Sequence, residues 1–455
     1  MRKDTAWRLF YAFETAGYIS QQLRADLMST QVDRLSEQRP HQSFASLRHS
    51  GYRAFFVGSA TAMLADSIEH VISYWVVFQK FHSPALGGFA VLSHWLPFLI
   101  FSVPVGALAD RRDPRRLIQL GMLLFTFVSL AWATLFVTDT LQMWHAMALL
   151  VIHGCAGVLW NTPAQALIHD IVAPDQLTSA VRLTATARYL GLLTGPAVGA
   201  ALLLALGPSK GLFVNALLYM PLTVWLWRAP YGNRFRQGQP TTRAALRFAD
   251  IVTTVRSVAD NLPIVSMTLL GGAASFFVGN SYQAQMPGFA YDLGHGDPGL
   301  SYSMLLSADA AGALSAGFVL ESRGLLTPAP RTACVLAMLW CCALGSFALI
   351  RLYPLALVLL FAAGFLELSF NTMAQALVQL HAPPAIRGRV IGLFSMTSLG
   401  FRTFSGLSVG LAGSMIGIHR SLALSAAAVF VVIGVLLAVT GRTTSGFRVA
   451  REPSG

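Results

Sequence analysis

Long apolar stretches dominate the chain and limit its fold more than any other feature. A helix that crosses a membrane needs about 20 mostly apolar residues, and about twelve stretches reach that length. They lie near residues 54–78, 86–109, 117–137, 142–167, 179–206, 211–227, 262–290, 299–320, 331–350, 353–379, 388–416 and 420–440. We therefore expect an all-helical membrane protein with twelve transmembrane helices.

Composition agrees with a surface that mostly contacts lipid. Only 11% of the 455 residues are charged and 55% are hydrophobic, whereas soluble domains carry about 25% charged residues. The cysteines lie in apolar stretches without zinc-type spacing, so we expect buried thiols and no metal site. Residues 1–47 mix acidic and basic residues and do not form a secretory signal.

The basic residues predict the orientation of these helices. With a cytoplasmic N-terminus, 25 Lys and Arg fall in cytoplasmic segments, and four fall on the other side: Lys80, Lys210, Arg351 and Arg420. Positive residues concentrate on the cytoplasmic side of membrane proteins, so we expect both termini there. Topology thus explains the excess of 32 Lys and Arg over 20 Asp and Glu, and we expect no nucleic-acid partner.

A repeated octet indicates two related halves. NTPAQALI begins at Asn161 and NTMAQALV at Asn371, an offset of 371 − 161 = 210, and Pro174 and Pro384 repeat at the same offset. Parallel halves of this kind imply an axis along the membrane normal, and transporters so built bind substrate between the halves. We expect a tail over 1–50, halves over 51–228 and 262–441, a basic linker over 229–261 and a tail over 442–455.

The loop after the second stretch carries a recognisable signature. GALADRRDPRRL at 106–117 resembles the loop 2–3 signature of the major facilitator superfamily, with Asp113 in place of a glycine and Pro114 in place of a basic residue. PAQALI after the fourth stretch and RGRVIGLFSM at 387–396 most resemble the siderophore and macrolide exporter branch, similar to the enterobactin exporter. Over 52–441, the resemblance implies the major facilitator fold and export of an amphiphilic small molecule across a bacterial inner membrane.

The signature residues predict a conformational clamp. Gly106 permits close helix approach, and the resemblance implies that Asp110 meets the positive N-terminal end of a helix in the other half, near 387–390. GFVLESR at 317–323 echoes GALADRR and supplies a second acid. The remaining clamp candidates, which otherwise reflect topology or lipid contact, are Arg111, Arg112, Asp170, Glu321 and Arg323.

A glycine-rich stretch bears on the direction of transport. GLLTGPAVGA at 191–200 looks like the G-x-x-x-G-P-x-x-G-G signature associated with superfamily antiporters, with Ala200 in place of the last glycine. Gly191, Gly195 and Gly199 form a small face at helical spacing, and Pro196 predicts a kink. Helix packing alone is the alternative explanation.

Charged residues inside the predicted spans are candidates for proton coupling, because each costs about 2.5–3.5 kcal/mol at a helix centre. Asp66, Glu69 and His70 lie at i, i+3 and i+4, on one helical face. They form either a proton site or a buried ion network that locks one conformation. The other candidates lie in later spans: Arg188, Asp309, Glu367 and Arg402.

The later charges have alternative roles. Arg188 neutralises a carboxylate of the first span or binds an anionic substrate. We expect Glu367 and Arg402 to pair with each other, and Asp309 either to be a second proton site or to cap a kink near Gly312.

Aromatic and amide side chains of the central spans are candidates for a substrate cavity. Packing and interfacial anchoring are the alternative roles for the aromatic residues, and bonding between helices for the amides. The cavity candidates are Trp95, Trp160, Asn161, Gln165, Tyr189, Phe276, Tyr282, Asn371 and Gln375.

The sequence contains no convincing catalytic constellation and no phosphate-binding loop. We therefore expect no enzyme and no cofactor, and transport driven by protons. The partners we expect are a small-molecule substrate, protons and membrane lipids, with the protein a monomer. Proton antiport of a siderophore, a macrolide-like drug or a related metabolite fits best, and such export would confer drug resistance. A proton-coupled importer and a non-transporting receptor or scaffold are the alternatives. Residues 6–28 form either an interfacial amphipathic helix or a loosely ordered tail.

Overall fold

The computed structural model describes residues 43–82, 84–232, 248–279, 281–293, 298–405 and 412–449. The regular structure of these ranges is helical, without strands, which confirms the all-helical class. The chain separates into two compact units, Met1–Ser43 and Phe44–Gly455, and every element below lies in the second. Residues 6–28, the middle of the basic linker and the end of the C-terminal tail lie outside the described residues.

The first half begins with six α-helices whose ends follow local sequence signals. Asp113 caps α4 by accepting a hydrogen bond from the Arg115 amide, and Pro114 occupies the first turn, where its missing N–H costs nothing. Gly207, with φ of 77°, interrupts α6 near the boundary predicted between the fifth and sixth spans. The helices are α2 (Ser50–Phe81), α3 (Pro84–Arg111), α4 (Pro114–Val137), α5 (Met143–Ile171), α6 (Leu177–Leu218) and α7 (Met220–Arg228).

The second half contains both long helices and broken ones. Its long helices are α12 (Pro298–Arg323), α13 (Pro330–Leu349), α14 (Tyr353–His381) and α18 (Ile418–Val449). The shorter ones are α8 (Ala249–Val258), α9 (Leu262–Phe277), α10 (Ser281–Ala284), α11 (Met286–Asp292), α15 (Arg387–Ser395), α16 (Arg402–Ser405) and α17 (Ala412–Ile416). A π-helical turn, Met396–Gly400, follows α15 directly.

Eight helices of the described residues are long and apolar enough to cross a membrane. One of these segments, Pro174–Arg228, is 55 residues long and covers the fifth and sixth predicted spans. The first predicted span coincides with α2, which carries Asp66, Glu69 and His70, and the seventh and eleventh are divided into shorter helices. Twelve crossings and cytoplasmic termini therefore stay predictions.

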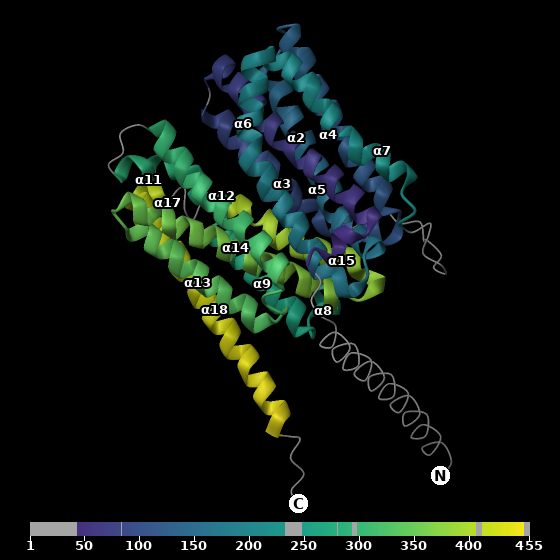
Figure 1. Cartoon of the computed structure of the whole chain (residues 1–455), viewed down its shortest axis with the longest axis vertical. Coiled ribbons are helices and arrows are strands. Elements are labelled where there is room, and N and C mark those ends of the chain that lie inside the picture. The colour runs from purple at the N-terminus through teal and green to yellow at the C-terminus, as the bar shows by residue number, and fades with distance from the viewer. Residues whose placement is uncertain are drawn as a thin grey trace, which may run out of the picture. The chain divides into compact units, whose positions relative to one another are not determined.

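Helix packing follows the repeat in the sequence. The helices of the first half, purple to teal, and most of the green and yellow helices of the second form two neighbouring groups, and α15 lies among the helices of the first (Figure 1). In the first half α5 packs on α3 and α4, and in the second half α14 packs on α12 and α13 in the same way. The two groups meet where α15 packs on α3 and where α12 packs on α6.

The small face of α6 packs against α2. A methyl group added to Gly191, Gly195 or Gly199 would meet Met63, Ser67 or Val71 respectively, so the four-residue spacing repeats on both helices. Pro196 remains inside α6, and the break in helical dihedral angles comes eleven residues later, at Gly207 (207 − 196 = 11). Met63, Ser67, Val71 and Pro196 of these two helices also line a cavity inside the protein.

Candidate functional site

A cavity of about 430 Å³ lies between the two halves. Most of the predicted cavity residues line it, namely Trp95, Trp160, Asn161, Gln165, Tyr189, Asn371 and Gln375. Phe276 and Tyr282 are absent from its lining: Phe276 packs on the rings of Phe401 and Phe404, and Tyr282 is fully buried. The cavity has the size of a small-molecule site and combines apolar walls with a few convergent polar groups.

In the first half, one histidine joins two carboxylates of α2. His153 of α5 lies with Nδ1 2.7 Å from Glu69 Oε1 and with Nε2 2.9 Å from Asp66 Oδ1. Ser129 donates a hydrogen bond to Glu69 Oε2, and Asn215 donates to the Ser129 hydroxyl. Glu69 is therefore buried with its charge satisfied by side chains from two other helices, and Asn215 of a third helix supports Ser129.

Two further histidines surround this network. The ring of His70 lies edge-on to His153 at 4.7 Å between centroids, and His94 of α3 lies 5.0 Å from His70. The prediction for α2 did not include His94 or His153. The one available signal was their position inside predicted spans, where titratable groups are rare.

In the second half, one phenol joins two carboxylates. Tyr282 Oη lies 3.1 Å from Asp309 Oδ2 and 3.2 Å from Glu367 Oε2, and Gln283 donates to Asp309 at 3.0 Å. All three side chains of the bridge are buried. A phenol has one proton to donate, so a second hydrogen bond to Tyr282 needs a proton on one of the carboxyl groups. The cluster can thus hold a proton between two acids.

Two arginines line the same cavity. Arg402 lies over the Trp95 ring, 4.9 Å from its centroid, and this contact joins the two halves. Arg402 and Glu367 are close enough to interact electrostatically, although the aromatic ring is the direct partner of the guanidinium. Arg188 lines the cavity beside Tyr189.

The predicted contact of Asp110 with a helix N-terminus is present. Asp110 accepts hydrogen bonds from the Gly388 amide at 2.5 Å and the Arg389 amide at 3.0 Å, at the start of α15. A methyl group on Gly106 would collide with the Gly388 carbonyl, so the two backbones touch here. Asp113, which departs from the signature, instead pairs with Arg115 at 2.6 Å.

The second acid of the repeat makes an equivalent contact by other means. Glu321, at the end of α12, accepts a hydrogen bond from the Ser179 hydroxyl and lies 3.7 Å from Arg182 Nη1. Arg182 also donates to the Leu320 carbonyl at 2.8 Å. Ser179 corresponds to Arg389 at the repeat offset, because 389 − 179 = 210. The sequence analysis selected neither Ser179 nor Arg182, and Arg182 is buried here.

The other clamp candidates lie at the same end of the helices. Arg111 pairs with Asp250 of α8 at 3.6 Å. Arg112, Asp170 and Arg323 stand at the ends of α3, α5 and α12. Gln165, from the repeated octet, accepts a hydrogen bond from Gln379 across the halves at 3.2 Å. The halves are thus joined on this side by charged and amide contacts.

Comparison with known proteins agrees with this architecture. The model of the transmembrane secretion effector family matches residues 41–449. Macrolide efflux protein A of Streptococcus pyogenes is 22% identical over 279 residues, which cover 59% of this chain and 65% of that protein. The matched region therefore spans just under two thirds of that relative.

Solved structures show the same fold. The human organic anion transporter TETRAN superposes with a TM-score of 0.65 and 15% identity, covering 85% of this chain and 98% of that one. The Escherichia coli fucose:proton symporter FucP gives 0.66 and 10%, with the same coverage. A bacterial homologue of the iron transporter ferroportin, in an outward-facing state, gives 0.64 and 15%, covering 86% of this chain and 99% of that one.

Proposed function

The chain belongs to the transmembrane secretion effector family of the major facilitator superfamily, whose members are transporters, and from this premise we propose that it exports an amphiphilic small molecule by proton antiport. The substrate class is a siderophore, a macrolide-like drug or a related metabolite. The proposed location is a bacterial inner membrane, where the protein would act as a monomer among lipids. Export of such compounds would confer resistance to them.

The central cavity is the observation that carries this proposal. Its walls offer aromatic rings from both halves, amides at symmetric positions in Asn161 and Asn371, and the charged groups of Arg188, Arg402 and Glu367. Such a mixture suits a small molecule with apolar surface and a few polar groups. Its place between two parallel halves is where alternating-access transporters bind their substrates.

Asp309 and Glu367 are the proposed coupling groups. Two buried carboxyls that share one partner cannot both be ionised at low cost, so one of them tends to hold a proton. Glu367 lines the cavity while Asp309 lies behind it, next to Tyr282. Arrival of a polar or cationic group of the substrate beside Glu367 would favour its charged form and release the proton. This is the exchange that antiport requires.

The test is transport by purified protein in liposomes with an imposed pH gradient. In antiport, substrate accumulates in the acidic compartment whichever way the protein is inserted, and in symport it accumulates in the alkaline one. We expect accumulation on the acidic side for at least one compound of a siderophore and macrolide panel. Macrolides are weak bases that collect passively in acidic vesicles, so protein-free liposomes and a proton ionophore define the passive level.

Substitutions in the carboxylate clusters of the two halves show which cluster couples proton movement to transport. Asp309→Asn and Glu367→Gln should lower gradient-driven accumulation to the passive level, and Asp139→Asn, in an exposed loop, is the matched control. Asp66→Asn and Glu69→Gln are measured beside them. Full accumulation in both second-half variants, with loss in the first-half ones, would move the coupling site to α2.

The direction of the gradient separates the alternatives. Accumulation on the alkaline side would make the protein a proton-coupled importer. A receptor or scaffold would give no flux of any compound and would tolerate neutral substitutions in both clusters. Idle buried charge is costly inside a membrane, so the two clusters argue for transport.

A further inference from the structure

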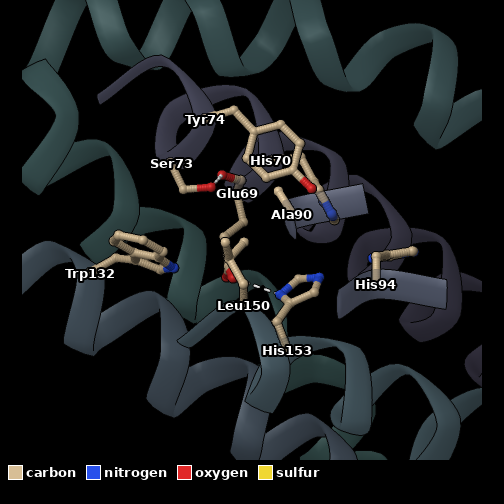
Figure 2. Close-up of a pocket in the computed structure, with 9 residues that line it drawn as sticks. All are labelled: Glu69, His70, Ser73, Tyr74, Ala90, His94, Trp132, Leu150 and His153. Carbon is tan, nitrogen blue, oxygen red and sulfur yellow. Dashed lines mark hydrogen bonds and ion pairs between the residues drawn. The ribbon is translucent and has the colours of Figure 1, made fainter. Parts of the chain in front are cut away.

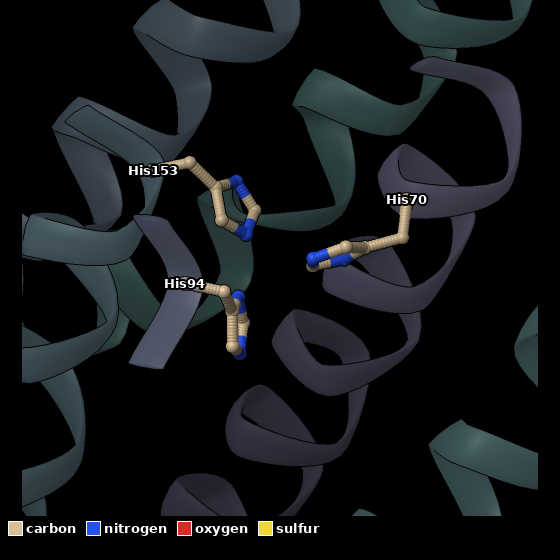
Figure 3. A group of neighbouring side chains, drawn as sticks. All are labelled: His70, His94 and His153. Atoms are coloured by element: carbon tan, nitrogen blue, oxygen red, sulfur yellow. The ribbon is translucent and has the colours of Figure 1, made fainter. Parts of the chain in front are cut away.

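Three histidines from three helices converge at the edge of the cavity. His70 of α2, His94 of α3 and His153 of α5 each place a ring nitrogen within 4.8 Å of the other two, and the three side chains point toward one another (Figure 3). They are distant in the sequence, because 94 − 70 = 24 and 153 − 94 = 59. All three helices belong to the first half, so the packing of that half brings the three histidines together.

The spacing of the ring nitrogens suits a small cation. An ion centred among three atoms 4.8 Å apart would lie about 2.8 Å from each, and side-chain shifts of less than about 1 Å would reach the 2.0–2.1 Å typical of zinc–imidazole bonds. A void of about 10 Å³ lies beside the three rings and is also lined by Glu69 and Trp132 (Figure 2). The room for an ion is already present.

Hydrogen bonds prepare two of the rings as ligands. His70 Nδ1 lies 2.7 Å from the Asp66 carbonyl, which only accepts, so its N–H donates there and neutral His70 keeps a lone pair on Nε2. His153 Nδ1 lies 2.7 Å from Glu69 Oε1. Histidines that bind metals usually donate their other N–H to a carboxylate or carbonyl in this way.

The other contacts of His153, His94 and the two carboxylates would be stabilised by a positive charge placed between these side chains. His153 Nε2 faces Asp66 Oδ1 at 2.9 Å, and a lone pair facing a carboxylate needs a proton or a cation nearby. His94 Nδ1 is buried and makes no hydrogen bond to the described residues. Within those residues, the ion pairs of Asp66 and Glu69 are all with histidines. A dication would balance both carboxylates at once.

We propose that His70, His94 and His153, with Asp66 as an oxygen ligand and Glu69 supporting His153, bind one divalent transition-metal ion, zinc or a metal of similar preference. Imidazole ligands suit zinc, copper, nickel and iron. Calcium and magnesium require mostly oxygen ligands and fit this set poorly. His70 and His94 line the large cavity, so the ion would enter from there and would stand in the wall of the proposed substrate site.

The test is metal binding by full-length protein purified with a tag that contains no histidine. Co²⁺ serves as a visible probe and Zn²⁺ as its competitor. We expect each chain to bind one Co²⁺ ion and to show the visible absorption spectrum of four-coordinate Co²⁺. Zn²⁺ should displace the Co²⁺, and Mg²⁺ should not. His94→Gln should weaken binding at least tenfold, and Glu69→Gln by about 10–100-fold. His381→Gln, at the far end of α14, is the matched control and should leave binding unchanged.

His94→Gln is chosen because it should weaken metal binding without unfolding the protein. His94 Nδ1 has no partner to lose among the described residues, and elution as a single species verifies the fold. X-ray absorption of Zn²⁺-loaded wild type adds a measurement without any substitution. We expect nitrogen and oxygen ligands near 2.0–2.1 Å. Sulfur ligands near 2.3 Å, no saturable binding, or unchanged affinity in His94→Gln would each overturn the proposal, and none of them depends on transport.

Discussion

Each half of the chain holds two carboxylates that share one bridging side chain, and the two bridges differ in kind. Asp66 is half-buried, and the other three carboxylates are buried. In the first half His153 joins Asp66 and Glu69. In the second half Tyr282 joins Asp309 and Glu367. An imidazole can carry positive charge or ligate a cation, whereas a phenol is neutral and has one proton to donate. On the two proposals above, the first cluster would balance its charge with a cation, and the second with a proton held on an acid.

The contacts that join the halves differ in the same manner. Asp110 reaches the backbone amides at the start of α15, where α3 and α15 touch backbone to backbone. Glu321 occupies the equivalent place and, with a longer side chain, reaches a hydroxyl and a guanidinium. Repeat symmetry preserves an acid at both positions, but the partner of each acid comes from the local sequence. One contact is rigid and the other adjustable.

The largest effect should come from Glu367→Gln. A glutamine keeps the shape and can accept from Tyr282 but cannot exchange a proton, so gradient-driven accumulation should fall to the passive level. Exchange of labelled for unlabelled substrate, without a gradient, should continue. Parallel transport and exchange measurements on one preparation distinguish lost coupling from a lost protein. Loss of both activities would show that Glu367 serves substrate binding or folding instead.

Removing the close contact of α3 with α15 should have the next largest effect. In Gly106→Ala the new methyl meets the Gly388 carbonyl, and a backbone cannot move aside as a side chain does. Overpacking costs about 1–3 kcal/mol, so the amides of Gly388 and Arg389 should exchange hydrogen at least about fivefold faster. Mass spectrometry of a peptide that covers 384–395 measures this rate.

Gly317→Ala is the matched variant in the other half. There the new methyl meets the Thr186 side chain, which can rotate. We expect a change in exchange at the start of α6 several-fold smaller than at α15 in Gly106→Ala. Equal effects in the two variants would remove the distinction between a rigid and an adjustable contact.

Much of this arrangement follows from the sequence, and what does not follow has a common reason. The spacing of Asp66, Glu69 and His70 fixed their shared face, and the octet and signature echoes placed Asp110 and Glu321 at equivalent loops. His94, His153, Gln283 and Ser179 were missed, because each is an ordinary polar residue until folding brings it to a neighbour from 24 to 142 positions away in the chain.

Helix breaks limited the prediction in a second way. Hydropathy over 262–290 and 388–416 predicts continuous spans, but Gly279, with φ of 49°, separates α9 from α10, and a π-helical turn follows α15. Phe276 was assigned to the cavity as an aromatic residue of the seventh predicted span. Instead it packs on Phe401 and Phe404. Backbone irregularity of this kind comes from tertiary contacts, which a periodic pattern does not contain.

A smaller effect is expected for Tyr282→Phe, which removes the phenol and keeps the ring. One hydrogen bond to a carboxyl contributes about 0.5–1.5 kcal/mol, so accumulation should fall by roughly 2- to 10-fold and not to the passive level. The initial rate of gradient-driven uptake is the measurement. Wild-type rates in this variant would mean that Asp309 and Glu367 act without the Tyr282 bridge. Tyr282 could then not be compared with His153 as a functional bridge between two carboxylates.

The smallest effect should come from an exposed acid. Asp139 lies outside the predicted spans, and its hydrogen bond from Lys80, 2.6 Å long, lowers the pKa of Asp139. Because the folded-state pKa is below the ordinary value, the stability from this pair is present above about pH 3.9 and is lost only as pH falls through the lowered pKa. Between pH 6 and 8, Asp139→Asn should therefore change the thermal midpoint equally at every pH, and by little, because exposed ion pairs contribute weakly. A pH-dependent change across that range would show that Asp139 is coupled to a group that titrates there, and would contradict its use as an uncoupled control.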